Sequence, residues 1–130
     1  GVCPQRGVAI DELRRDLTWK QGQARLWPQT ERLKAAVALA QMSSGADRSI
    51  HLAQAREAVA GLGLYFTGVP KGLWRDKLLQ DGSFVDEPVP ASSFYHIVHA
   101  IAELARSDLD VGRQGAESKA SLKLVEPAFR

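Results

Sequence analysis

Cysteine is almost absent from this chain, and long hydrophobic runs are absent altogether. Cys3 is the only cysteine among the 130 residues, so no disulfide can form within the chain, and we expect a reducing, cytoplasmic environment. No apolar stretch reaches the roughly 20 residues that a membrane-spanning helix needs, and no signal-peptide pattern is visible. We therefore expect no association with a membrane.

An excess of charge of either sign is also missing. The 17 lysines and arginines and the 15 acidic residues leave a formal net charge of +2, and the basic residues form no long run. Nucleic-acid binding needs a concentrated basic surface, so we expect no nucleic-acid partner. What the chain does contain, 45% hydrophobic and 25% charged residues, is typical of a globular protein.

Hydrophobic periodicity predicts three amphipathic helices. Pro28 suits the first turn of the first helix, where its missing N–H costs nothing. Asp47 is a good N-cap for the second helix, and Ser92 or Ser93 for the third. The predicted helices cover residues 28–42, 48–62 and 92–106, and the core-facing stripe of the third consists of Phe94, Ile97, Val98, Ile101, Leu104 and Ala105.

Two long connections precede the first and third helices, and they are related in sequence. Asp-Glu-Leu at 11–13 and Asp-Lys-Leu at 76–78 stand 65 residues apart, and the same offset takes Glu31 to His96. The dipeptide at 81–82, Asp-Gly, indicates a tight hairpin. A period that holds two helices predicts an array of helical hairpins or a toroid. Such units bury their faces against neighbours, and this chain holds only about one and a half of them. We therefore expect a fragment, or a chain that completes itself by association.

His96 and Glu31 are the candidate functional residues. On a helical wheel each lies nearly opposite the apolar stripe of its helix, with alanines below it, as in helices whose N-terminal ends converge on a cavity. The positive end of a helix disfavours a charged imidazole, so a neutral His96 can take up a proton and later return it. A nearby carboxylate would hold the orientation of the ring.

Simpler interpretations of these residues stay open at this point. A histidine near a helix start is often a solvated surface residue, and Glu31 in a first turn can simply complement the helix dipole. His96 and His99 are three residues apart, but no third ligand stands at a convincing spacing, so we expect no metal. Trp27 could pack in the core or stack on a sugar face at the mouth of a cavity.

Two segments carry a resemblance to a known family. Residues 25–31 (Arg-Leu-Trp-Pro-Gln-Thr-Glu) and 90–97 (Pro-Ala-Ser-Ser-Phe-Tyr-His-Ile) resemble two C-terminal motifs of the N-acylglucosamine 2-epimerase family, and the likeness extends through most of residues 7–106. That family includes mannose isomerases and cellobiose epimerases. The resemblance implies a mainly α fold, a partial (α/α)6 barrel built as a toroid of helical hairpins with short β-hairpin loops.

The resemblance also implies a chemistry that needs no cofactor. In the family a pair of histidines moves a proton at the sugar carbon next to the carbonyl, through an enediolate-type intermediate. His96 matches the C-terminal histidine of the pair, Glu31 a carboxylate in the site, and Trp27 a neighbouring aromatic residue, so we expect Glu31 and Trp27 to bind substrate. The expected substrate is a monosaccharide or sugar phosphate, in mannose–fructose isomerisation or N-acylglucosamine epimerisation.

One departure limits what this chain can do alone. The family's other catalytic histidine lies upstream in a His-x-x-Glu motif, whereas His51 is followed by Leu-Ala-Gln. We therefore expect residues 1–107 to be the C-terminal portion of the barrel domain and residues 108–130 to be a tail, partly packed through residues 122–125 or disordered. We expect the chain to be inactive alone and to associate with itself or with a missing N-terminal part. The alternative is a non-catalytic helical-repeat module for protein interaction.

Overall fold

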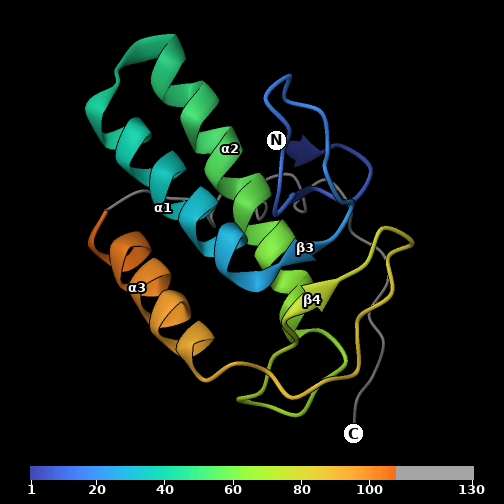
Figure 1. Ribbon diagram of the computed structural model, residues 1–130. Helices are drawn as coiled ribbons and strands as arrows, with labels where there is room; N and C mark the ends of the chain where they lie inside the picture. The colour runs from blue at the N-terminus through green and yellow to red at the C-terminus, as the bar shows by residue number, and fades with distance from the viewer. Residues whose placement is uncertain (108–130) are drawn as a thin grey trace, which may run out of the picture.

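The computed structural model describes residues 1–107, and this part of the chain is mainly helical (Figure 1). The predicted tail, including residues 122–125, lies outside the described residues. No helix in residues 1–107 combines the length and the apolar character needed to cross a bilayer. The helical elements are α1 (Leu26–Met42), α2 (Gly45–Gly63), the 3₁₀ turn η1 (Leu64–Phe66) and α3 (Ser92–Arg106).

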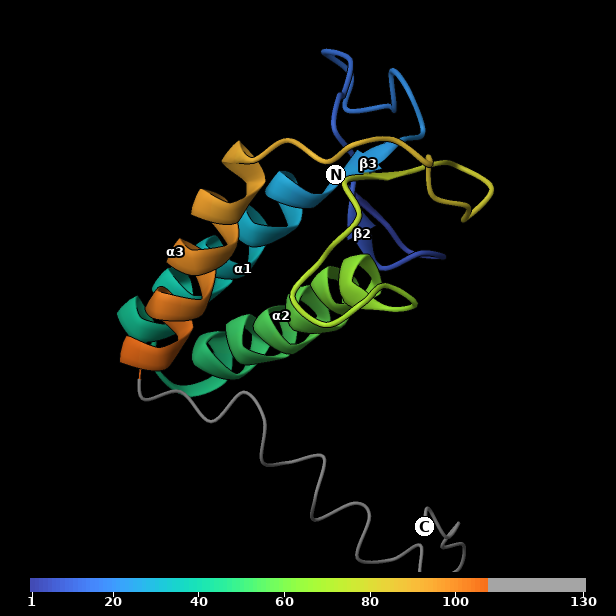
Figure 2. The same cartoon turned by 90° about the horizontal axis from the view of Figure 1, so that it is seen from below.

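Helix α1 lies between the other two helices. It forms an antiparallel hairpin with α2, and α3 packs along its other side (Figures 1 and 2). Helices α1 and α3 run in the same direction (Figure 1). The first turns of these two helices therefore come together at one end of the molecule.

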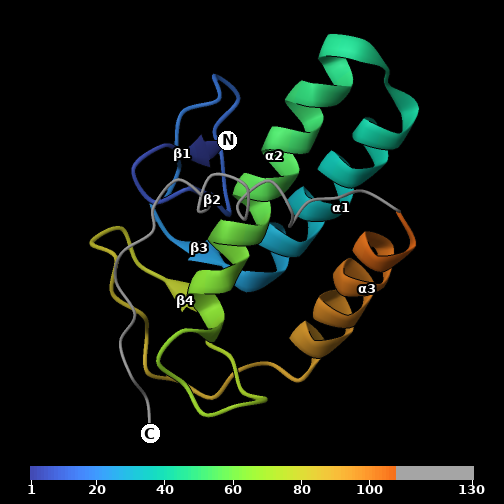
Figure 3. The same ribbon diagram turned by 180° about the vertical axis from the view of Figure 1, so that it is seen from behind.

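Four two-residue strands form two small antiparallel sheets at this end of the molecule. Strand β1 (Val2–Cys3) pairs with β2 (Val8–Ala9), and β3 (Ala24–Arg25) pairs with β4 (Lys77–Leu78). Strand β3 leads directly into α1 (Figure 3). The β3–β4 pair therefore joins the loop before α3 to the start of α1.

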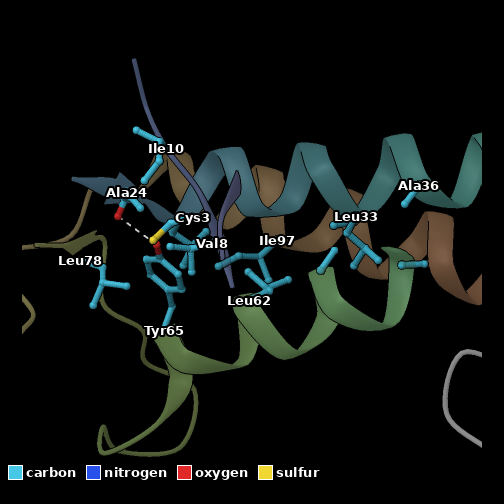
Figure 4. Packing of buried hydrophobic residues seen from close by; sticks show 14 of the residues in the cluster. Cys3, Val8, Ile10, Ala24, Leu33, Ala36, Leu62, Tyr65, Leu78 and Ile97 are labelled. Carbon is cyan, nitrogen blue, oxygen red and sulfur yellow. Dashed lines mark hydrogen bonds between the residues drawn. The ribbon is translucent and has the colours of Figure 1, made fainter. Parts of the chain in front are cut away.

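The core lies where the helices meet the sheets, and Tyr65 is its largest fully buried side chain (Figure 4). Its hydroxyl donates a 2.9 Å hydrogen bond to the carbonyl oxygen of Ala24. Burial raises the pKa of Tyr65, so the hydroxyl stays a neutral donor. The core has members from all three helices and from strands β2 and β4, including Val8, Leu26, Leu33, Val37, Ala55, Leu62, Leu78, Ile97 and Ala100.

The two long connections form the same hairpin, which confirms the repeat in the sequence. Leu13 bridges Trp19, and, 65 residues later, Leu78 bridges Phe84. Each turn closes with an equivalent backbone hydrogen bond, and the ladder bond below it is also repeated. The equivalent bonds join Arg14 N to Thr18 O, Leu79 N to Ser83 O, Lys20 N to Glu12 O, and Val85 N to Lys77 O.

An aspartate shapes each turn in the same way. Asp16 Oδ1 accepts hydrogen bonds from the backbone N–H and the hydroxyl of Thr18. Asp81 Oδ1 accepts the same two bonds from Ser83. Aspartate commonly stabilises a turn by bonding to the residue two positions on, so the predicted Asp-Gly hairpin is confirmed and has a counterpart without glycine.

The three predicted helices are present, but two of the predicted caps are wrong. Helix α2 begins at Gly45 with Ser44 at the N-cap, which places Asp47 inside the first turn. Helix α3 has Ala91 at its N-cap position, and the Ser93 hydroxyl donates instead to Asp76. A short polar side chain can cap its own helix or bind a neighbouring residue. The Ser93 hydroxyl binds the buried carboxylate of Asp76 and therefore does not cap α3.

The predicted core stripe of α3 is only partly correct. Ile97 is buried, but Phe94, Val98 and Ile101 are each about half exposed, at 57%, 44% and 58%. Among the described elements, α3 packs chiefly on α1, and one neighbour covers only one side of a wide apolar stripe. The structure thus confirms a mainly helical fold, whereas the (α/α)6 barrel stays a prediction.

Candidate functional site

Glu31 and His96 meet between the second turns of α1 and α3, so Glu31 lies one turn further into its helix than the sequence predicted. Nδ1 of His96 lies 3.0 Å from Oε1 of Glu31, a contact between residues 65 apart in the chain. Both side chains are partly accessible, with exposed fractions of 32% for His96 and 42% for Glu31. Ala100, one turn after His96, is completely buried, and its small side chain allows the two helices to approach. The sequence repeat therefore brings its two ionisable positions into contact.

Lys34 shares the carboxylate of Glu31 with His96. Its Nζ lies 2.7 Å from the same oxygen, Oε1, one helical turn away. Partial burial acts to raise the pKa of Glu31, but the hydrogen bonds from Lys34 and His96 outweigh it, and the pKa lies below its usual value. Glu31 is therefore ionised at neutral pH and can only accept hydrogen bonds.

An ionised Glu31 selects the tautomer of a neutral His96. Because the carboxylate can only accept, Nδ1 of the neutral ring must carry the hydrogen that is shared between them. The lone pair is then on Nε2, on the opposite side of the imidazole from Glu31. A carboxylate partner of this kind fixes the orientation of the ring. The pair is thus arranged as a base with its orienting group.

Aromatic rings flank His96 on two sides. The Trp27 ring lies 6.0 Å from the imidazole at an interplanar angle of 42°, and the Tyr95 ring meets it edge-on at 5.6 Å. Both aromatic residues remain exposed. Trp27 therefore lies beside the pair and not in the core. At this exposed position the flat face of a ligand can reach its ring.

A cluster of three charged residues, in which Asp76 is buried and Arg25 partly exposed, underlies the starts of both helices. Arg25, just before α1, lies between Asp11 and Asp76, and we call these three residues the Arg25 cluster. Burial raises the pKa of Asp11, against the opposing hydrogen bond and charge of Arg25. The two aspartates are equivalent in the repeat, so each hairpin contributes one acid to the same guanidinium.

Three of the residues predicted from the sequence lie together in the candidate site, whereas the charged residues around them were not predicted. His96, Glu31 and Trp27 come together, while Lys34 and the Arg25 cluster were not singled out. Lys34 has a sequence signal, its spacing of three residues from Glu31 on a helix. In contrast, the contact of Arg25 with two distant aspartates depends on the fold alone.

The other histidines have different surroundings. His51, on α2, has Nδ1 2.9 Å from Oε1 of Gln54, which stands where a His-x-x-Glu motif would place its glutamate. His99 contacts the ring of Tyr95, with 4.1 Å between centroids. Within residues 1–107, no group of three or more His, Cys, Asp and Glu side chains has the arrangement of a metal site.

Comparison with known proteins adds to this geometry. A family model described as N-acylglucosamine 2-epimerase (GlcNAc 2-epimerase) matches residues 1–100. The chain is similar to a protein named mannose-6-phosphate isomerase from Rhizobium meliloti (strain 1021), with 51% identity over 104 residues. The aligned region covers 80% of this chain but only 27% of that relative. No solved structure matches the chain.

Proposed function

Since the chain belongs to the N-acylglucosamine 2-epimerase family, we propose that it supplies the C-terminal part of a cofactor-independent sugar isomerase or 2-epimerase. The observation that carries this proposal is the 3.0 Å contact between His96 and Glu31. It leaves Nε2 of a neutral imidazole free to exchange a proton with a bound sugar.

The proposed step is a proton abstraction at the sugar carbon next to the carbonyl. Nε2 of His96 takes the proton, the C–H electron pair forms a carbon–carbon double bond, and the carbonyl electrons move to oxygen to give an enediolate. Return of a proton to the opposite face of the same carbon re-forms the carbonyl and gives the epimer. The isomer forms when the hydroxyl proton on that carbon's oxygen moves to the former carbonyl oxygen and a proton returns to the neighbouring carbon. Glu31 stabilises the imidazolium while it carries the proton.

The partner base and most of the binding surface lie outside this chain in our proposal. The family pairs its C-terminal histidine with one in a His-x-x-Glu motif, and Gln54 replaces that glutamate at His51. The chain also spans only about a quarter of the curated relative it matches. We therefore propose that the 130-residue chain is inactive alone, and measurable mannose–fructose interconversion by the purified chain would contradict this.

The substrate we propose is a monosaccharide or sugar phosphate of the mannose type. The relative from Rhizobium meliloti is named for mannose 6-phosphate, and the motif at residues 90–97 resembles mannose-isomerase-like members of the family. Trp27, exposed beside His96, offers an apolar ring to one face of the sugar. Lys34 is a cation at the same place, paired with Glu31.

A chimera provides the test of this proposal. This chain would replace the matching segment of the Rhizobium meliloti relative, and turnover of mannose 6-phosphate would be measured. We expect His96→Asn to lower kcat by at least about 10²-fold, the usual contribution of a positioned acid–base group. His99→Asn, on the same helix, is the matched control and should retain activity.

Circular dichroism must show that both variants keep the helical content of the parent chimera. An active His96→Asn variant would exclude the proton-transfer role of this histidine. Equal loss in His96→Asn and His99→Asn would point to a general defect of α3, and it would also contradict the proposal. A chimera that binds protein partners but never turns over sugar would favour the non-catalytic module.

A further inference from the structure

Asp76 is a buried acid that the proposed chemistry does not use. It precedes β4, and its side chain is 1% exposed. Burying a carboxylate is energetically unfavourable unless it is paired and hydrogen-bonded. The groups around Asp76 therefore indicate what it holds in place.

Asp76 is bonded to the starts of both helices that carry the site. Its backbone carbonyl accepts a 2.8 Å hydrogen bond from the N–H of Leu26, the first residue of α1. Its Oδ1 accepts a 3.2 Å hydrogen bond from the Ser93 hydroxyl in the first turn of α3. Its Oδ2 lies 3.5 Å from Nη1 of Arg25, directly before α1. One residue thus links α1 to α3 through three separate contacts.

These contacts lie one to two turns from the candidate site. Ser93 is three residues before His96 on α3, and Leu26 is five residues before Glu31 on α1. A hydrogen bond between the two helices weakens steeply when its donor and acceptor move apart. The relative position of the two helix starts therefore decides whether His96 and Glu31 remain in contact.

We propose that Asp76 is a positioning residue for the Glu31–His96 pair, acting through its hydrogen bond from Ser93 and its ion pair with Arg25. The catalytic meaning of this inference rests on the proposed function, although the positioning itself does not. A carboxylate offers one oxygen to Ser93 and the other to Arg25. An asparagine has a single oxygen, so it can serve only one of them, and Asp76→Asn removes one of the two side-chain contacts without changing the size of the side chain.

Asp11 provides an internal control from the same repeat. It occupies the equivalent position in the first hairpin, and it also pairs with Arg25. Its other side-chain bond is to the backbone N–H of Arg25 rather than to α3. Asp11→Asn therefore disturbs the Arg25 cluster to a similar degree but leaves the Asp76–Ser93 link intact.

The experiment measures the tautomer of His96 by ¹⁵N NMR of the full 130-residue chain, at a pH where the ring is neutral. The contact with Glu31 favours the Nδ1–H form, and Glu31→Ala, which removes the acceptor, gives the reference for its loss. We expect Asp76→Asn and Ser93→Ala to shift the His96 signal from the Nδ1–H position toward that reference. Ser93→Thr, which keeps the hydroxyl, and Asp11→Asn should retain the signal of the parent chain.

Two results would overturn the proposal. The first is a parent-like His96 signal in Asp76→Asn and Ser93→Ala, or in Ser93→Ala alone where Asp76→Asn fails to fold. The second is an equal shift in Asp11→Asn, which would mean that any damage to the Arg25 cluster has the same effect. The NMR readout needs no turnover, so an inactive chimera would contradict the proposed function without deciding the role of Asp76.

Discussion

At the scale of single residues, the decisive feature is that one oxygen of Glu31 serves two partners. Lys34 and His96 both reach Oε1, at 2.7 and 3.0 Å. Lys34 keeps the carboxylate ionised without depending on the state of the imidazole. An acid–base histidine must change its charge during a reaction, and a carboxylate with a second cation remains an acceptor throughout.

This arrangement predicts a pH-dependent contribution of Glu31 to stability. The pKa of Glu31 is lowered in the folded chain, against a usual value of 4.5. Its ionised form therefore stabilises the fold above that value, and the contribution is lost as the pH falls through the lower folded-state pKa. We expect Glu31→Gln to reduce the free energy of unfolding near neutral pH but not in strong acid.

Urea unfolding of the parent chain and of Glu31→Gln across this acid range would measure the effect. The two stabilities should converge as the pH is lowered. Asp16→Asn serves as a comparison for the same pH dependence, because hydrogen bonds from Thr18 also lower the pKa of Asp16. Its stability should likewise converge with that of the parent chain as the pH is lowered. A constant difference between the parent and Glu31→Gln at every pH would contradict the assignment.

The residues of the site could be predicted only where a pattern in the sequence marks them. The 65-residue offset pairs Glu31 with His96, and the helical wheel puts both away from the main apolar stripe. The burial of Asp76 has no such signal, because an aspartate in a loop is usually solvated. Its partners lie 51 residues before it and 17 residues after it, and only the complete fold brings them together.

At the scale of elements, the two hairpins differ at a strained position. Leu17 and Gly82 are equivalent in the repeat, and both have positive φ angles, 65° and 87°. A side chain in this left-handed region costs roughly 1–2 kcal/mol, and glycine does not pay this cost. Leu17 is 75% exposed, so packing does not offset the strain.

A reciprocal exchange at these positions predicts opposite effects on stability. Gly82→Leu should lower the free energy of unfolding by roughly 1–2 kcal/mol, since the site has open space and only the backbone is strained. Leu17→Gly should raise it by less than about 1 kcal/mol, because glycine also gains freedom in the unfolded chain. Chemical denaturation would measure both. A stabilising effect of Gly82→Leu would contradict a left-handed backbone conformation at residue 82.

Element boundaries show where sequence reasoning stops. Periodicity located all three helices, because an apolar stripe extends over several turns and tolerates a local error. A helix cap depends on which of several possible partners one side chain binds. The Ser93 hydroxyl binds Asp76 and not a backbone N–H of its own helix. Such a choice is set by a neighbour that the local sequence does not contain.

At the scale of the whole molecule, the helices present apolar side chains that residues 1–107 cover only in part. Val98 and Ile101 on α3, and Leu39 and Met42 on α1, are at least 44% exposed. Apolar residues at helical spacing are expected to pack against further helices. The predicted barrel would provide such helices, and the number of repeat units in the sequence likewise predicts that further units are needed.

We expect the isolated chain to associate with itself through these faces. Sedimentation velocity should show a concentration-dependent increase in average mass, because exposed apolar area favours contact between copies. Replacing Val98 and Ile101 together by lysine should reduce this association. Leu17→Lys adds charge at an exposed apolar residue of the first hairpin and should have little effect. A monomeric parent chain at all concentrations would contradict the expectation.

The Arg25 cluster also makes the two repeat units structurally different from each other. Arg25 receives one aspartate from its own unit and one from the next, so a single guanidinium joins two successive units. The residue 65 positions later is Pro90, which has neither a charge nor a backbone N–H to offer a third aspartate. The two units are therefore not interchangeable modules. The first unit binds the unit that follows it through the ion pair between Arg25 and Asp76. A unit placed after α3 could not form the equivalent ion pair, so it would have to be held by other interactions.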